Sequence, residues 1–284
     1  MKVAVVGCGA VGSAFAFTLA KAGHDVTCVA RPGARLQQLQ AAHGVVAKSG
    51  TAATSVADAL DVNIAYDLVI VTVLAPQVGA VLPALSASKA AGVLFMFNTF
   101  ESLDPLRDAV GAARFAFGFP SILAHLHEGV LDFNFLTSGQ ITTVSDARWA
   151  KLFNDAGIGT VVHDDMHSWL RSHAAFAIPL MSIGCLLLAR GGRALTMSEA
   201  SAYARAWVDG FALVRKLGGR VTPSNVSMAA SLPRPIVTTL LWAASRTQMV
   251  RDTGAHGPQE ARMLIDQMTA AAPGQTANLL AIRP

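Results

Sequence analysis

The fold is decided by residues 1–32, M-K-V-A-V-V-G-C-G-A-V-G-S-A-F-A-F-T-L-A-K-A-G-H-D-V-T-C-V-A-R-P. Lys2–Val6 is a short β-branched run, which predicts a strand buried on both faces. Ala10–Lys21 contains no helix breaker and predicts a helix that Gly23 ends. Asp25–Ala30 predicts a second strand. This order of strand, glycine-rich turn, helix and strand is typical of a dinucleotide-binding unit.

The turn after the first strand has G-x-G-x-x-G spacing, with glycines at 7, 9 and 12. Gly7 permits a tight turn, Gly9 lets the backbone approach a pyrophosphate, and Gly12 lets the helix pack close to the sheet. The first helical residues, Ala10 and Val11, present free N–H groups at the positive end of the helix dipole. We therefore expect these five residues to bind a dinucleotide.

The end of the second strand indicates which dinucleotide binds. Arg31 stands where an NAD-preferring site carries Asp or Glu, and Arg35 follows four residues later. A guanidinium fork suits a 2′-phosphate, whereas a carboxylate would repel it. The sequence therefore predicts NADP(H) as the cofactor. The alternative is that Arg31 is only a solvated residue at a strand end.

Composition narrows the class of protein. The 284 residues are 52% hydrophobic and 14% charged, with a net charge of +4 and scattered basic residues. Charged residues usually make up about 25% of a chain, so we expect extra buried apolar surface in a homodimer. The scattered charge does not favour nucleic acid. Three cysteines, at 8, 28 and 185, fit neither a disulfide framework nor a metal site, and they favour the cytoplasm.

Strands and helices continue to alternate as far as residue 163. The predicted elements are strands at 67–74, 93–97, 114–119 and 159–163, helices at 34–42 and 146–156, and short extended segments at 44–54, 130–135 and 139–145. Residues 55–63 predict an irregular or helical link. We therefore expect residues 1–163 to form a Rossmann domain with a doubly wound sheet.

The carboxyl ends of parallel strands bind ligands in such sheets. Thr72, Val73 and Leu74 end one predicted strand, and Gln77 begins the helix after it, so all four are candidate cofactor contacts. Asn98 ends the next strand. It could hold the nicotinamide ribose or a substrate oxygen, or it could cap the helix that begins near Ser102.

Residues 164–284 predict a helical substrate and dimerisation domain. Helices are expected at 166–190, 198–217, 233–252 and 258–271, with Thr196 as a cap. The apolar segment 174–189 is shorter than the roughly 20 residues of a membrane span and contains Pro179, so we expect a buried central helix and no membrane contact.

Nearly end to end, the chain resembles the ketopantoate reductases. The resemblance rests on these features: G-C-G-A-V-G at 7–12, Arg31, V-T-V-L-A-P-Q at 71–77, Asn98, G-F-P at 118–120, Trp169, M-V-R-D at 249–252 and Glu260. It implies a Rossmann domain, a helical domain similar to that of 6-phosphogluconate dehydrogenase, and NADPH-dependent reduction of a 2-oxo acid that supplies pantoate for coenzyme A.

The resemblance also implies roles for individual residues. Gly7, Gly9, Gly12, Arg31 and Gln77 would bind NADP, and Asn98 would touch nicotinamide and substrate. Glu260 would hold a small carboxylate substrate or orient the catalytic cation, with His256 nearby in the sequence.

The chain departs from the family at three positions. Leu74 and Arg171 stand where ketopantoate reductases carry Lys, and Ala175 stands where they carry Asn. Arginine stays charged and is a poor proton donor, although it could polarise a carbonyl or clamp a carboxylate. His173 is the alternative acid, because imidazole titrates near neutrality. Residues two apart on a helix point about 200° apart, so both cannot face one cleft of a regular helix.

Three functions follow from these observations. The first is an NADPH-dependent reductase of a small 2-oxo acid, with hydride transfer in an interdomain cleft. The second is an NADP-dependent dehydrogenase of a different hydroxy or imino acid. The third is a non-catalytic NADP-binding regulatory protein.

Overall fold

A computed structural model describes residues 1–254 and 257–284, and the chain divides into two compact units. The first unit contains Met1–Asn98 and Leu103–Met166. The second contains Thr99–Ser102 and His167–Pro284. The short segment Thr99–Ser102 therefore groups with the helical second unit, although both of its sequence neighbours belong to the first.

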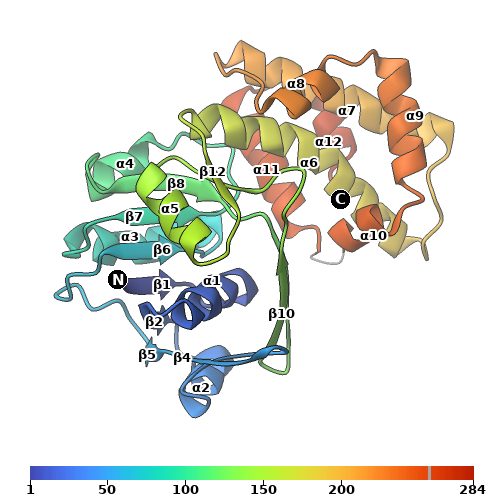
Figure 1. The fold of residues 1–284 in the computed structure, drawn as a ribbon. Helices are drawn as coiled ribbons and strands as arrows, with labels where there is room; N and C mark the ends of the chain where they lie inside the picture. The colour runs from blue at the N-terminus through green and yellow to red at the C-terminus, as the bar shows by residue number, and fades with distance from the viewer. Residues whose placement is uncertain (255–256) are drawn as a thin grey trace. The chain divides into compact units, whose positions relative to one another are not determined.

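The first unit is built on an eight-stranded sheet (Figure 1). From one edge the strands are β5 (Ser55–Ala57), β2 (Asp25–Val29), β1 (Lys2–Val6), β6 (Leu68–Val71), β7 (Val93–Met96), β8 (Phe115–Phe119), β11 (Thr142–Val144) and β12 (Thr160–Val162). The first six are parallel, and β11 pairs with β8 antiparallel. This 3-2-1-4-5-6 order of the parallel strands confirms the predicted doubly wound Rossmann fold.

Helices connect the strands of this sheet. They are α1 (Ala10–Lys21), α2 (Ala34–Ala41), α3 (Val78–Ala87), which a 3-10 turn at Ala75–Gln77 precedes, α4 (Asp104–Val110) and α5 (Ala147–Asp155). Parallel strands need such crossovers, because a tight turn cannot join them.

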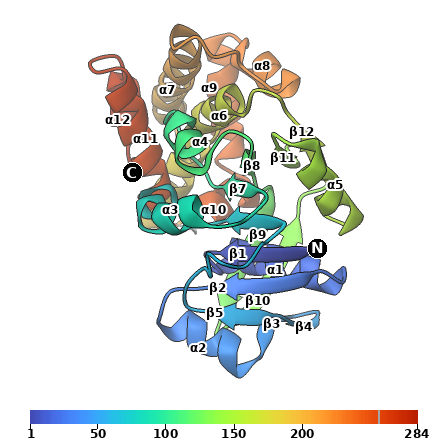
Figure 2. The ribbon, with the colours of Figure 1, turned by 90° about the vertical axis from the view of Figure 1, so that its left-hand side faces the viewer.

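A second, four-stranded sheet lies beside α1 (Figures 1 and 2). Its strands are β4 (Gly50–Ala53), β3 (Gly44–Ala47), β10 (Val130–Phe135) and β9 (Ile122–His127). Phe15 and Phe17 of α1 meet Phe135 and Phe133 of β10, with ring centroids 5.2 and 5.7 Å apart. Helix α1 is therefore buried between two sheets, which explains why its sequence is apolar on most sides.

The second unit is helical. Its elements are α6 (Met166–Ala189), α7 (Met197–Lys216), α8 (Ser224–Ala230), α9 (Arg234–Ala244), α10 (Gln248–Gly254), α11 (Gln259–Ala271) and α12 (Ala277–Ala281). By length and composition α6 could cross a membrane, but buried core helices share these properties, and 50% of its most apolar window is buried. The ring of Phe100, from the Thr99–Ser102 segment, is fully buried in the same core.

Several predicted boundaries were wrong. The predicted link at residues 55–63 contains β5, and β9 was missed because its exposed face carries Leu123 beside His125 and His127. Helices α8 and α12 were also missed. The predicted helix at 233–252 is two helices, because the chain turns at Ser245, whose hydroxyl accepts the Leu195 N–H at 3.1 Å.

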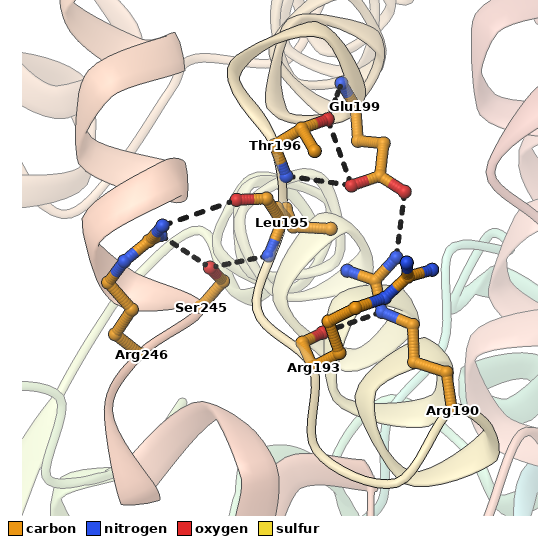
Figure 3. A network of polar contacts seen from close by, with 7 residues as sticks. All are labelled: Arg190, Arg193, Leu195, Thr196, Glu199, Ser245 and Arg246. Atoms are coloured by element: carbon orange, nitrogen blue, oxygen red, sulfur yellow. Dashed lines mark hydrogen bonds and ion pairs between the residues drawn. The ribbon is translucent and has the colours of Figure 1, made fainter.

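Figure 3 shows the polar network at the turn between α6 and α7. Thr196 caps α7, as predicted, and Glu199 completes a capping box by accepting the Thr196 N–H at 2.7 Å. Glu199 also accepts from Arg190 Nη1 at 2.7 Å. The hydrogen bonds from Thr196 and Arg190 hold the pKa of the Glu199 carboxyl at about 2, below its usual 4.5.

The Glu199 carboxylate should therefore contribute stability that depends on pH. Because its folded-state pKa lies below 4.5, the contribution is full above that pH and is lost as the pH falls toward 2. We expect Glu199→Gln, which keeps the capping acceptor but loses the charge facing Arg190, to lower the thermal midpoint at pH 7. The two proteins should converge near pH 2. A midpoint difference that stays constant over the pH series would contradict this assignment.

Candidate functional site

Four chain segments converge on the carboxyl edge of the large sheet. The glycine-rich turn follows β1, Arg31 follows β2, Thr72–Leu74 follows β6, and Asn98 follows β7. These strands are neighbours and parallel, so their carboxyl ends lie at one edge. The topology thus gathers most of the predicted cofactor residues there.

The glycine-rich turn packs tightly against Thr72. The Thr72 hydroxyl donates to the Gly7 carbonyl at 2.9 Å. A Cβ on Gly12 would lie 2.4 Å from both the Gly7 oxygen and Thr72 Oγ1, so no side chain fits at position 12. Gly7 has a φ of +100°, and a Cβ there would lie 2.7 Å from Val73. Both glycines are thus required by the protein's own packing.

Gly9 differs from these two glycines. Its φ is −69°, which any residue adopts, and a Cβ there would meet nothing within 4 Å. Gly9 precedes α1, which has no side-chain cap and no acidic residue in its first turn. The N–H groups of Ala10 and Val11 are among those that a helix leaves without intrahelical partners. An open cradle at an uncapped helix start fits the pyrophosphate of a dinucleotide.

Asn98 supplies a second unexplained polar group. It is 7% exposed, and its Oδ1 is buried with no hydrogen-bond partner. The alternative that Asn98 caps the next helix is wrong, because α4 begins at Asp104 with Leu103 at the cap position. A buried acceptor without a donor costs free energy, about 1–3 kcal/mol. Asn98 therefore fits a residue whose partner is a ligand.

The two arginines after β2 differ in their surroundings. Arg31 is exposed and lies two residues after Val29, whose carbonyl accepts the Gly7 N–H at 3.0 Å. Arg35 is partly buried and donates to the Cys8 carbonyl at 3.0 Å. Only Arg31 is thus placed as a solvent-facing cation beside the turn.

The residues after β6 form the start of the next helix. Val73 packs against Gly7, as described above, and Leu74 is 59% exposed. Gln77 is exposed, and its Oε1 accepts the Leu74 N–H at 3.2 Å. Where the resemblance implies a lysine, this edge therefore presents an apolar side chain to solvent.

In the second unit, Arg171 and Gln267 hold the backbone of Phe100. Arg171 Nε donates to the Phe100 carbonyl at 3.2 Å, and the guanidinium lies 5.2 Å from the centre of the Phe100 ring. Gln267 of α11 accepts the Phe100 N–H at 2.8 Å. Phe100 is two residues beyond Asn98 in the chain. Sequence reasoning missed Gln267, because a lone Gln on a helix gives no signal.

His173 lies on a different face of α6 from Arg171. Its ring stacks on Trp169, with centroids 5.3 Å apart and an interplanar angle of 6°. Burial lowers the pKa of His173 from its usual 6.5 to about 4. The imidazole is therefore neutral at pH 7, and it holds no proton that it could readily donate as an acid.

Glu260 lies in the first turn of α11, partly exposed, seven residues before Gln267. Two helical turns separate the residues, so both lie on one side of α11. His256 lies outside the described residues. Ala175 is fully buried, and a Cβ on Gly210 of α7 would lie 3.3 Å from its Cβ. A larger side chain at position 175 would therefore have little room on the side that faces α7.

The described residues, 1–254 and 257–284, contain no group of three His, Cys, Asp or Glu that could hold a metal ion.

The family model for ketopantoate reductase PanE/ApbA matches residues 3–146, slightly more than half of the chain. No curated protein matches the chain in sequence. Among solved structures, 2-dehydropantoate 2-reductase from Geobacter metallireducens GS-15 is 16% identical, with a TM-score of 0.75 over 100% of this chain and 98% of that one.

Two other solved structures share the fold. The PanE/ApbA family ketopantoate reductase from Ralstonia eutropha JMP134 is 20% identical, with a TM-score of 0.72 over 100% of this chain and 97% of that one. D-mandelate dehydrogenase in complex with NADH is 16% identical, with a TM-score of 0.71 over 100% and 97%. At these identities the likeness shows the fold alone.

Substitutions at Gly9 and Gly12 should separate ligand binding from packing. We expect Gly9→Val to keep the stability of the wild type within about 0.5 kcal/mol, because the position is open, and to weaken NADH and NADPH binding at least tenfold. Gly12→Ala should cost about 1–3 kcal/mol of stability through overpacking. Thermal unfolding and fluorescence titration measure the two effects. Unchanged binding by Gly9→Val would show that no ligand occupies the cradle.

Proposed function

Because this chain belongs to the ketopantoate reductase PanE/ApbA family, we propose that it is a nicotinamide-dependent reductase of a small 2-oxo acid. The observation that carries the proposal is the open cradle at Gly9, since the protein's own packing gives no reason for a glycine there. The fold relative D-mandelate dehydrogenase supports it, because that protein has been solved with NADH and with anilino(oxo)acetate.

The cofactor we propose is NADP(H). Gly9 and the N–H groups of Ala10 and Val11 would hold the pyrophosphate, and Arg31 would contact the 2′-phosphate. Asn98 would bond the nicotinamide ribose or the substrate oxygen through its buried amide. The reduced nicotinamide supplies the hydride when bound. The preference for NADP over NAD rests on Arg31 and on the absence of Asp or Glu at that position.

Arg171 is the residue we propose to act on the substrate. Reduction of a ketone places negative charge on its oxygen before a proton arrives, and a fixed cation stabilises that charge. Arg171 is held by Phe100 and keeps its charge at all relevant pH values. It can polarise the carbonyl or clamp the carboxylate, but it does not supply the proton. Glu260 would orient this cation or contact the substrate.

His173 is a weaker candidate than Arg171 for a catalytic role. With a pKa of about 4 it is neutral at pH 7, and its ring is stacked on Trp169. We propose that the proton reaches the product oxygen from water and that His173 has a structural role.

A second candidate is the reverse reaction on a different 2-hydroxy acid. It is favoured by the likeness to D-mandelate dehydrogenase and by Leu74, an exposed apolar residue where the family carries Lys. Both candidates use the same cofactor and the same site. We also propose a cytoplasmic location, because the three cysteines are free.

The experiment that tests the function is a substrate panel. Purified protein with NADPH is given ketopantoate, aliphatic 2-oxo acids and aromatic 2-oxo acids, and loss of nicotinamide absorbance is followed. Matching 2-hydroxy acids with NADP⁺ test the reverse direction. We expect turnover of at least one 2-oxo acid. Tight NADPH binding without turnover on either panel would instead favour a non-catalytic NADP-binding protein.

The role of Arg171 can be tested through the pH dependence of the rate. Arg171→Met should lower kcat/KM about 100- to 1,000-fold, as loss of one electrostatic stabiliser does. Arg171→Lys should retain part of the activity and should lose it at alkaline pH, because lysine deprotonates and arginine does not. Arg215→Met, on the exposed face of α7, is the matched control. Equal activity of Arg171→Met and wild type would remove Arg171 from the site.

A further inference from the structure

Arg35 is the second residue of α2, four residues after Arg31, and its guanidinium donates to groups inside the first unit. Its Nε donates to the Cys8 carbonyl at 3.0 Å, and its Nη2 donates to Ser13 Oγ at 2.7 Å. Its Nη1 donates to the Gly129 carbonyl at 3.1 Å. All three nitrogens of the fork are thus engaged with the protein, and the contacts reach two separate segments of the chain, residues 8–13 and Gly129.

The Cys8 carbonyl receives a second donor from the start of α1. Ser13 is fully buried, and its hydroxyl donates to the Cys8 oxygen at 3.1 Å while it accepts from Arg35. At the other end of the same peptide group, the Gly9 N–H donates to the Gly7 carbonyl at 2.7 Å. The plane of the Cys8–Gly9 peptide is therefore fixed from both sides.

The orientation of this peptide matters for an anion at the turn. A carbonyl oxygen that pointed toward the cradle at Gly9 would repel a phosphate, whereas N–H groups attract it. Arg35 and Ser13 hold the Cys8 oxygen away by satisfying it inside the unit. The planar guanidinium donates from Nε to the Cys8 oxygen and from Nη2 to Ser13 at the same time. The ammonium group of a lysine does not have this fixed pair of donors.

The third contact of Arg35 reaches the small sheet. Gly129 lies in the two-residue turn between β9 and β10, where Glu128 and Gly129 have φ values of 50° and 86°. Positive φ at both positions is typical of a type I′ hairpin turn. Arg35 thus ties the hairpin to the glycine-rich turn, although 94 residues separate Arg35 from Gly129.

We infer that Arg35 is a positioning residue for the dinucleotide-binding turn, while the 2′-phosphate is contacted by Arg31. This inference rests on the proposed function, since it assigns roles within the proposed cofactor site. It revises the expectation from sequence, in which both arginines suited a 2′-phosphate. The two roles differ in a measurable way, because NADH and NADPH share the turn and differ only at the 2′ position.

The test compares the same substitution at both positions. Arg35→Gln should weaken NADH and NADPH binding by the same factor, about tenfold or more, so the ratio of the two Kd values stays at the wild-type value. Arg31→Gln should weaken NADPH binding about tenfold to several hundredfold and leave NADH binding nearly unchanged. Fluorescence titration of the full chain with each nucleotide gives all the Kd values.

Two further variants apply if Arg35→Gln does not fold. Arg35→Lys keeps the charge but cannot reach Cys8, Ser13 and Gly129 together, and it should show a smaller, equal loss for both nucleotides. Ser13→Ala removes the other donor to the Cys8 carbonyl. Because both residues act on one oxygen, the Ser13→Ala and Arg35→Lys losses should combine non-additively in a double-mutant cycle.

Selective loss of NADPH binding by Arg35→Gln or Arg35→Lys would overturn the inference and make Arg35 a cofactor ligand. Wild-type affinity for both nucleotides in those variants would also overturn it. A wild-type protein that binds neither NADH nor NADPH would instead overturn the proposed function, and the role of Arg35 with it. Failure of the function and failure of the inference are therefore distinguishable.

Discussion

The carbonyl oxygens of Gly7 and Cys8 accept hydrogen bonds from side chains inside the first unit, and the candidate site depends on these bonds. Thr72 donates to Gly7, and Ser13 and Arg35 donate to Cys8. The N–H groups at the start of α1 would attract an anion, so the oxygens of the turn have to point inward. Gly12 is part of the same arrangement, because any side chain there would displace the Thr72 hydroxyl. The turn is thus built by three neighbouring segments as much as by its own glycines.

In the helical unit, side chains likewise hold the backbone groups of a short segment, here at Phe100. The N–H and the carbonyl of Phe100 are each held by one side chain, from Gln267 and Arg171 respectively. The Arg171 guanidinium is thereby fixed against an aromatic ring and a carbonyl, which reduces the conformational entropy that it would lose on binding an oxyanion. A cation held in this way supports the proposal that Arg171 acts where the family carries lysine.

Sequence alone predicted the parts of the fold that depend on short-range pattern. The glycine spacing, the buried strands and the capping of α7 by Thr196 are local, and the structure has the predicted strands and cap. The break between α9 and α10 was not predictable, because it depends on Ser245 accepting the Leu195 N–H from 50 residues away. The inward turn of Arg35 depends on Cys8 and Gly129 in the same way. The roles of Gln267 and Ser13 carry no sequence signal, since each is one polar residue in a helix.

The Thr99–Ser102 segment makes the helical unit discontinuous in sequence. Phe100 is fully buried in the core of that unit, yet it is encoded between β7 and α4 of the Rossmann unit. A fragment of residues 167–284 would lack this ring and would leave a cavity, for which loss of a buried Phe costs about 3–5 kcal/mol. Recombination between relatives at the boundary after Met166 would bring together a Phe100 segment and a helical core of different ancestry. A change in the helical core around Phe100 therefore has to be matched by a change in a segment that lies before Met166 in the sequence.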